Sequence, residues 1–227
     1  MKRIIISILT IILLMSSTFA LADDFTIHNG VVFGMTKNDV KETEISAGFT
    51  YNSDSDDLFG KCKKHNSFLS FSGTVAGIDG ANITYHFNSQ DALESAIYTL
   101  GFSTAKYGTS ELFSSLSNSL ESKYGSEDTV AKLMIEDNYL DCCVNAYYDR
   151  WETSVSKVQV TDSKAFTYKN DNGDTVVIYI SSLNIALSTG QSAGEGLYIF
   201  YQIYDADAYS NAYEKVGNDA TNAYDDL

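Results

Sequence analysis

The first 22 residues constrain the fold most, because they are expected to be cleaved off, so that only the residues after them can form the folded protein. Lys2-Arg3 precedes an almost unbroken apolar run over residues 4–15, and small residues follow, ending in Ala20-Leu21-Ala22. This order is typical of a secretory signal peptide, and the apolar run is too short to span a bilayer. We therefore expect cleavage near Ala22 and a secreted or extracytoplasmic protein that has no membrane span.

Composition indicates a folded and strongly acidic chain. Hydrophobic residues make up 44% of the sequence, there are 16 Tyr and no Pro, and the formal net charge is −15. The absence of Pro argues against a stiff Pro-rich linker between domains. The negative electrostatic field of such a chain repels phosphate backbones and anionic lipid, so we expect no nucleic-acid partner. The expected partner is instead an extracellular protein or polymer, whose identity the sequence does not give.

Short-range signals organise the chain up to residue 66. Thr36 followed by Asp39 is a helix-capping pattern, and it predicts a short helix over residues 37–44. A strand with a break at Asn29-Gly30 precedes this helix. The polar stretch 52–66 is typical of an exposed loop.

Alternating apolar residues predict an antiparallel meander between residues 67 and 100. Turns are expected at Asp79-Gly80 and at residues 88–91, because both stretches are rich in turn-forming residues. In the middle strand, Ile83 points to one face and His86 to the other. We expect His86 on the solvent side of this strand.

The second half repeats the order of a helix followed by strands. Apolar residues recur at helical spacing up to Tyr124, with Gly125 at the C-cap position, and a second helix is predicted over residues 129–148. Three strand segments follow, beginning at Trp151, Thr175 and Leu197. The stretches predicted to separate these strands are a turn at residues 170–174 and a flexible loop at residues 190–196.

These segments predict an α+β fold in which an antiparallel β-sheet packs against two or three helices, with a tandem helix-plus-sheet repeat as a hypothesis. Residues 23–204 form a single domain in this interpretation, with halves at 23–103 and 104–204 that share one sheet or abut closely. Residues 205–227 form an acidic C-terminal tail, which is either a docked helix or frayed.

Cys62, Cys142 and Cys143 are the cysteines of the chain. Outside the cell one disulfide is favoured, from Cys62 to either member of the adjacent pair, and a bridge closing about 80 residues stabilises by roughly 4 kcal/mol in the chain-entropy model. A strained Cys142–Cys143 bridge is an alternative. A third interpretation is a reactive Cys62 thiolate, because lysines and a histidine surround it in the sequence and lower a thiol pKa.

Searches for catalytic and ligand motifs identify no catalytic, cofactor-binding or metal-binding residue. Histidine occurs at positions 28, 65 and 86 alone, and the sequence contains no nucleophile elbow, metal-ligand spacing or phosphate-binding glycine loop. We therefore expect no cofactor. Acidic clusters at residues 54–57 and 170–174 are typical of solvated loops, and neither matches a calcium-binding spacing.

Aromatic residues provide one candidate binding surface. It comprises Tyr147, Tyr148, Trp151, Tyr198, Tyr201 and Tyr204. Tyr and Trp are enriched at binding hot spots, although packing within the core and the strands is the competing explanation. The favoured function is therefore a non-enzymatic binding protein, and the alternative is a secreted hydrolase with unidentified acidic catalytic residues.

The opening of the chain resembles that of many small exported bacterial proteins of unknown function. The matching residues are Phe25 to Gly30, followed by Phe33-Gly34-Met35-Thr36 and Val40; later landmarks are Gly77-Ile78-Asp79, Ile83, Tyr85, Phe87, Leu120 and Lys123-Tyr124-Gly125. This layout is similar to the β-lactamase-inhibitor-protein fold and to the small lipoprotein subunit of the outer-membrane assembly machine. The resemblance implies a helix-plus-antiparallel-sheet unit that binds other proteins and catalyses nothing. Unlike the lipoprotein subunit, this chain has no Cys at the predicted cleavage site.

Overall fold

The computed structural model describes residues 25–53, 67–75, 78–100, 109–136, 155–187 and 192–225. These residues form an α+β fold with one seven-stranded antiparallel sheet and a separate two-stranded sheet, which confirms the predicted fold class. The helices are α2 (Lys37–Ser46), α3 (Thr109–Tyr124), α4 (Thr129–Ile135) and α6 (Ala206–Asp225). The strands are β1 (Thr26–His28), β2 (Val31–Val32), β3 (Thr50–Ser53), β4 (Ser67–Val75), β5 (Ile78–Phe87), β6 (Leu93–Leu100), β7 (Val155–Lys169), β8 (Thr175–Leu187) and β9 (Ser192–Tyr204).

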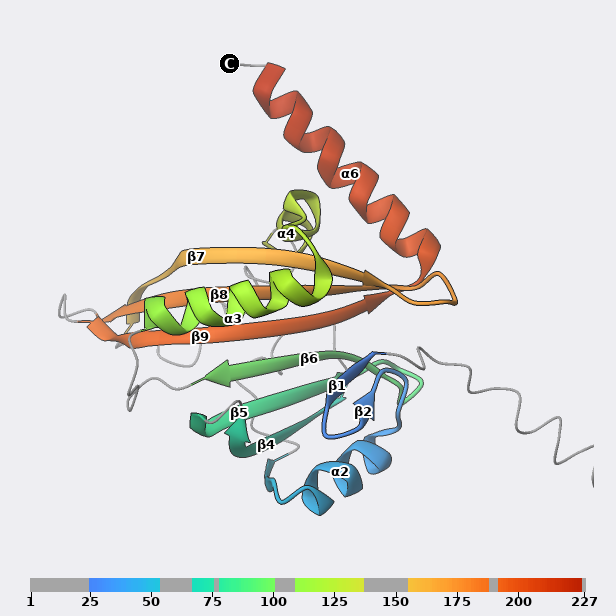
Figure 1. The fold of residues 1–227 in the computed structure, drawn as a ribbon, viewed down its shortest axis with the longest axis vertical. Coiled ribbons are helices and arrows are strands. Elements are labelled where there is room, and N and C mark those ends of the chain that lie inside the picture. Colours follow the sequence, from blue (N-terminus) through green and yellow to red (C-terminus); the bar gives the residue numbers. More distant parts are fainter. Residues whose placement is uncertain are drawn as a thin grey trace, which may run out of the picture.

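Both halves of the chain contribute to one continuous sheet. Its strand order is β3-β4-β5-β6-β9-β8-β7, so the two halves meet where β6 pairs with β9. This pairing runs from Ser95 opposite Gln202 to Leu100 opposite Leu197. In each half the helices precede an antiparallel run of strands, and the last strand of each run forms the junction (Figure 1).

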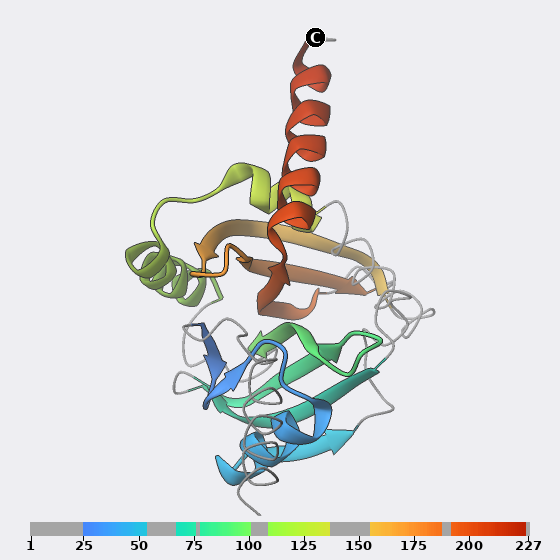
Figure 2. The same cartoon turned by 90° about the vertical axis from the view of Figure 1, so that its right-hand side faces the viewer.

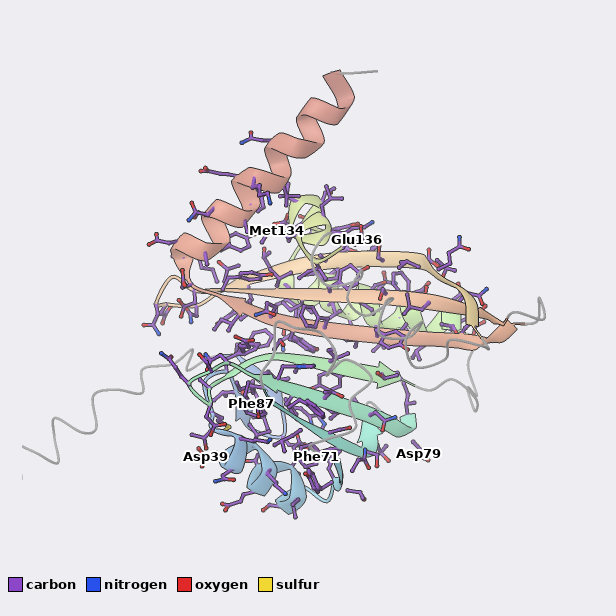
Figure 3. All side chains as sticks on the ribbon, turned by 180° about the vertical axis from the view of Figure 1, so that it is seen from behind. Asp39, Phe71, Asp79, Phe87, Met134 and Glu136 are labelled. Carbon is purple, nitrogen blue, oxygen red and sulfur yellow. The ribbon has the colours of Figure 1, made fainter. Side chains whose placement is uncertain are left out.

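The two faces of the sheet pack against different helices. One face packs with β1, β2, α2 and α3 around a core that includes Phe71, Phe87 and Ile178. The other face packs with α4 around a second cluster that includes Val177 and Phe200. Figure 3 shows Phe71 and Phe87 in the half of the molecule that carries α2, and Met134 and Glu136 at α4. Neighbouring residues of β8 therefore enter different cores, because side chains alternate along a strand.

The first described residue connects the beginning of the chain to both halves. Phe25 is 3% exposed, and its ring centroid lies 6.0 Å from that of Phe33 in the N-terminal half. The same ring lies 5.9 Å from Tyr124, 5.4 Å from Tyr168 and 5.8 Å from Tyr201. These three tyrosines belong to α3, β7 and β9, so Phe25 packs at a point where distant segments converge.

The predicted start of α2 and the predicted end of α3 are both confirmed. The Thr36 hydroxyl accepts a hydrogen bond from the Asp39 amide at 3.3 Å and donates to the Asp39 carboxylate at 2.7 Å, at the start of α2. Gly125 follows α3 with a φ of +94°, and its amide donates to the Glu121 carbonyl at 2.9 Å. These contacts satisfy backbone groups that helix ends leave without partners.

The meander of β4, β5 and β6 is confirmed, but one of its turns lies earlier than predicted. Val75 pairs with Ile78, so the chain reverses before Asp79-Gly80, and this dipeptide belongs to β5. The turn at residues 88–91 is where the sequence placed it. There the Asn88 side chain accepts hydrogen bonds from the backbone amides of Gln90 and Ala92.

The structure differs from the prediction at His86 and at the start of β9, and it describes only part of the second predicted helix. His86 is 0% exposed, so the expectation of a solvent-facing side chain is wrong; its ring lies 6.3 Å from that of Phe68 on the neighbouring strand. β9 begins at Ser192, inside the predicted loop, because Ser192 already pairs with Ala186. The predicted helix over residues 129–148 is described as α4 up to Ile135, and residues 137–148 lie outside the described part.

The acidic tail contains a docked helix. Asp205 precedes α6 and accepts a hydrogen bond from the Ala208 amide at 2.7 Å. The Tyr209 ring lies 6.2 Å from that of Tyr204, and Val216 is buried. Beyond its contacts with β9 and α4, the helix extends away from the sheet, as Figures 1 and 2 both show.

Candidate functional site

Several of the residues singled out from the sequence lie outside the described part of the chain. These are Cys62, Cys142, Cys143, Tyr147, Tyr148 and Trp151. The disulfide alternatives and the reactive-thiol interpretation of Cys62 therefore stay predictions.

The other three residues of the predicted aromatic surface lie on two faces of the sheet. Tyr198 is 6% exposed and belongs to the core that includes α4, and Tyr204 packs against the same core. Tyr201, by contrast, packs into the core with α2 and α3. Burial raises the pKa of the Tyr204 hydroxyl to about 12 and raises the pKa of Tyr201 further. These tyrosines do not share one surface, because alternate residues of β9 face opposite ways.

An open pocket of about 560 Å³ lies where α3, α4, β7 and α6 meet. Its size is within the range typical of small-molecule sites. The connection between α3 and α4 forms most of its wall, and β7 and α6 contribute one lining residue each. Its lining residues are Tyr124, Gly125, Ser126, Glu127, Asp128, Thr129, Val130, Thr167 and Tyr213.

Asp128 holds the elements around this pocket in place. Its Oδ1 atom accepts a hydrogen bond from the Ala131 amide at 2.9 Å, which caps α4. Its Oδ2 atom accepts from the Tyr209 hydroxyl of α6 at 3.5 Å, and its backbone amide donates to the Ala165 carbonyl of β7 at 2.9 Å. Burial, followed by the Asp128 carboxylate, raises the pKa of the Tyr209 hydroxyl. Asp128 is therefore a positioning residue.

Glu127 is the more accessible carboxylate of the pocket. It is 33% exposed, and its Oε1 atom lies 3.8 Å from the Lys132 ammonium, which is also partly exposed. An ion pair this long and this exposed contributes little stability. A cation from outside the protein can therefore replace Lys132 at Glu127 at small cost.

Tyrosine rings line the pocket beside this carboxylate. The Lys123 ammonium lies 4.9 Å from the centroid of the Tyr124 ring, a cation–π distance. Tyr213 of α6 also lines the pocket, and its ring lies 5.5 Å from that of Tyr209. The pocket thus combines an accessible carboxylate with aromatic rings, one of which already contacts an ammonium group. This combination suits a cationic ligand.

A second cluster centres on the buried carboxylate of Glu44, a residue for which the sequence predicted no role, and extends to the partly exposed His28 and the exposed Asn29. Glu44 is 0% exposed. Its carboxylate accepts hydrogen bonds from the Tyr85 hydroxyl at 2.5 Å and from the Asn29 amide at 3.2 Å, and it lies 3.1 Å from His28 Nδ1. Burial, then Tyr98 and Glu44, raises the pKa of Tyr85. The spacing of Glu44 from Val40 along α2 is a signal that could have placed it on the buried face of the helix.

A third cluster joins the C-terminal end of α4 to strands β7 and β8. Glu136 Oε1 accepts hydrogen bonds from the Ser163 hydroxyl at 2.8 Å and from the Tyr179 hydroxyl at 3.1 Å. Burial, followed by the charge of Glu136, raises the pKa of Tyr179. Ser163 and Glu136 are both partly buried. A serine that donates to a carboxylate is one element of a nucleophile–base arrangement.

Within the described residues, no three His, Cys, Asp or Glu side chains are grouped so that they could hold a metal ion. None of the described helices is long and apolar enough to cross a bilayer. Comparison with protein-family models, with curated proteins and with solved structures found no match to this chain.

Proposed function

We propose that this protein is exported by cleavage of its leader near Ala22 and binds a cationic group of an extracellular protein or polymer. The pocket formed by α3, α4, β7 and α6 is the binding site in this proposal. The observation that carries it is the accessible Glu127 carboxylate beside the tyrosines of an open pocket. The opening of the chain resembles that of small exported proteins of unknown function, whose layout is similar to the protein-binding β-lactamase-inhibitor-protein fold, and this resemblance favours the same class of function.

Charge favours a ligand of this kind. The chain has a formal net charge of −15. The charged residues of the expected leader are all basic, so cleavage leaves an exported protein that is still more acidic. Such a field raises the local concentration of cations and speeds their association. A lysine side chain or another ammonium group contacts Glu127 by charge and the Tyr124 or Tyr213 ring by cation–π attraction. A ring contact of this type contributes about 0.5–2 kcal/mol.

Calorimetric titration of residues 23–227 with a lysine-rich peptide tests this proposal. We expect saturable binding that weakens as salt is added, and no binding of a glutamate-rich peptide of equal length. Glu127→Gln should weaken binding about two- to fivefold, the size expected for an exposed ion pair.

Glu42→Gln provides the matched control, because Glu42 is an exposed residue of α2 and removing it changes the net charge equally. We expect this variant to bind the lysine-rich peptide as the wild type does. Equal weakening by the two variants would mean that the peptide responds to net charge alone, which contradicts a pocket site.

A secreted hydrolase is the second candidate, favoured by the 2.8 Å contact between Ser163 and Glu136. In that case a fluorophosphonate probe should label Ser163, and Glu136→Gln should abolish labelling, because the carboxylate would accept the serine proton. The binding proposal expects no labelling of Ser163 in the folded protein. Peptide mapping of probe-treated protein distinguishes the two results.

A further inference from the structure

Asn29 and Gly30 form the two-residue turn between β1 and β2. Both residues are exposed, and their φ angles are +47° and +88°. An Asn-Gly dipeptide suits such a turn, since both positions require a positive φ. The same dipeptide is chemically reactive, because glycine has no side chain to hinder attack of its backbone nitrogen on the preceding side-chain amide.

We propose that Asn29 is a deamidation site that the contact with Glu44 holds unreactive in the folded protein. In the reaction, the Gly30 nitrogen bonds to Cγ of Asn29, the Cγ–Nδ2 bond breaks, and ammonia leaves with the proton of the Gly30 amide. Water then opens the resulting succinimide at either carbonyl. The product is aspartate or isoaspartate, with no oxidant or reductant involved.

The folded structure opposes the first step. Asn29 Nδ2 donates a hydrogen bond to Glu44 Oε2 at 3.2 Å, which points the amide toward the protein interior. His28, the preceding residue, lies 3.1 Å from the other oxygen of the same carboxylate. To bring Cγ onto the Gly30 nitrogen, the side chain must leave Glu44 and the turn must distort. The reaction therefore requires opening of this hairpin, a local unfolding event.

Deamidation would then prevent the hairpin from closing as before. The new carboxylate replaces a hydrogen-bond donor with an acceptor and faces Glu44, which is fully buried. Two carboxylates that share one site repel, so the new carboxylate must turn away from Glu44 and the contact that closes the turn is lost. Deamidation of Asn29 would thus keep the β1–β2 hairpin from returning to its closed form.

The chain contains a second Asn-Gly pair that serves as an internal control. Asn172 is exposed, and it lies with Gly173 in the turn between β7 and β8. The Gly173 amide donates to the Asn170 carbonyl at 3.1 Å, so this pair also sits in an ordered turn. A comparison of the two sites sets the contact of Asn29 with Glu44 against an Asn-Gly turn in the other half of the chain.

The test incubates residues 23–227 at mildly alkaline pH, folded and in urea, and follows both sites by peptide mapping for aspartate and isoaspartate. We expect products at Asn29 to form at least about tenfold more slowly in the folded protein than in urea, with a smaller ratio at Asn172. Equal folded and unfolded rates at Asn29, or equal protection of the two sites, would overturn the proposal.

A variant pair tests the consequence independently. Asn29→Asp should shift the unfolding equilibrium by about tenfold or more toward the unfolded state, as expected for a like-charge pair at a buried site. Asn172→Asp, at an exposed turn, should leave this equilibrium nearly unchanged. The proposal is wrong if both variants unfold alike. If Asn29→Asp does not fold, the reaction rates of the wild-type protein decide the matter.

Discussion

Replacing Phe25 with Ala is expected to lower the free energy of unfolding by about 3–5 kcal/mol, the usual cost of removing a fully buried aromatic ring. The ring lies within 6.0 Å of Phe33 and within 5.9 Å of three tyrosines, measured between centroids. Its loss would leave a cavity at a point where the beginning of the chain meets α3, β7 and β9. Two of its neighbours, Tyr168 and Tyr201, are held by strands of the sheet and cannot easily move to fill it.

Urea denaturation followed by circular dichroism measures this change. Thr26→Ala is the matched control, because Thr26 is the next residue along the chain and is exposed. We expect the control to stay within about 0.5 kcal/mol of the wild type. A Phe25→Ala variant as stable as the control would show that the Phe25 ring does not pack as the structure describes.

Replacing Glu44 with Ala is expected to cost about 2–4 kcal/mol, because a buried donor loses its acceptor and a buried side chain loses its packing. The change leaves the buried Tyr85 hydroxyl without this acceptor, whereas the amide of the exposed Asn29 can turn to water. Unsatisfied buried donors lose the full cost of leaving water. The hairpin of β1 and β2 should loosen as well, since both of its turn-side contacts, His28 and Asn29, reach Glu44.

Two variants complete this series. Glu42→Ala removes an exposed carboxylate from the same helix and should change the free energy of unfolding by less than about 0.5 kcal/mol. Tyr85→Phe removes one donor and leaves Glu44 with others, so we expect an intermediate loss of about 1.5–3 kcal/mol. If Glu44→Ala proves no more destabilising than Glu42→Ala, the carboxylate is not buried in this network.

Features with local physical causes were predictable from the sequence. The Thr36 cap of α2 and the glycine that ends α3 each depend on groups a few residues apart. The turn at Asn88 is of the same kind, because its side chain binds amides two and four residues ahead. Alternation of apolar residues likewise predicted the meander of β4, β5 and β6, but it did not predict β3, which begins at Thr50 and overlaps the predicted loop.

Features that depend on distant partners were not predictable in this way. No pattern near Leu100 indicates that it lies opposite Leu197, so the junction of β6 with β9 follows only from the whole fold. The burial of His86 has the same origin. Alternation correctly assigns its face of the strand, but it does not say whether that face is covered.

The candidate pocket shows this limit most clearly. Tyr124, Thr167 and Tyr213 come from α3, β7 and α6, and no spacing in the sequence relates them. The sequence drew attention to tyrosines of β9 instead, but neighbouring residues of that strand enter opposite cores. The cap that Asp128 forms on α4 is a local contact that was not predicted, and its contact with Tyr209 depends on the docked position of α6.

Residue-resolved NMR during titration with the lysine-rich peptide tests the central claim most directly. We predict that the largest chemical-shift changes occur at the pocket, in residues 124–130 and at Thr167 and Tyr213. Shift changes that spread evenly over the acidic surface, or that centre on the exposed face of α2, would contradict a cation-binding site between α3, α4, β7 and α6.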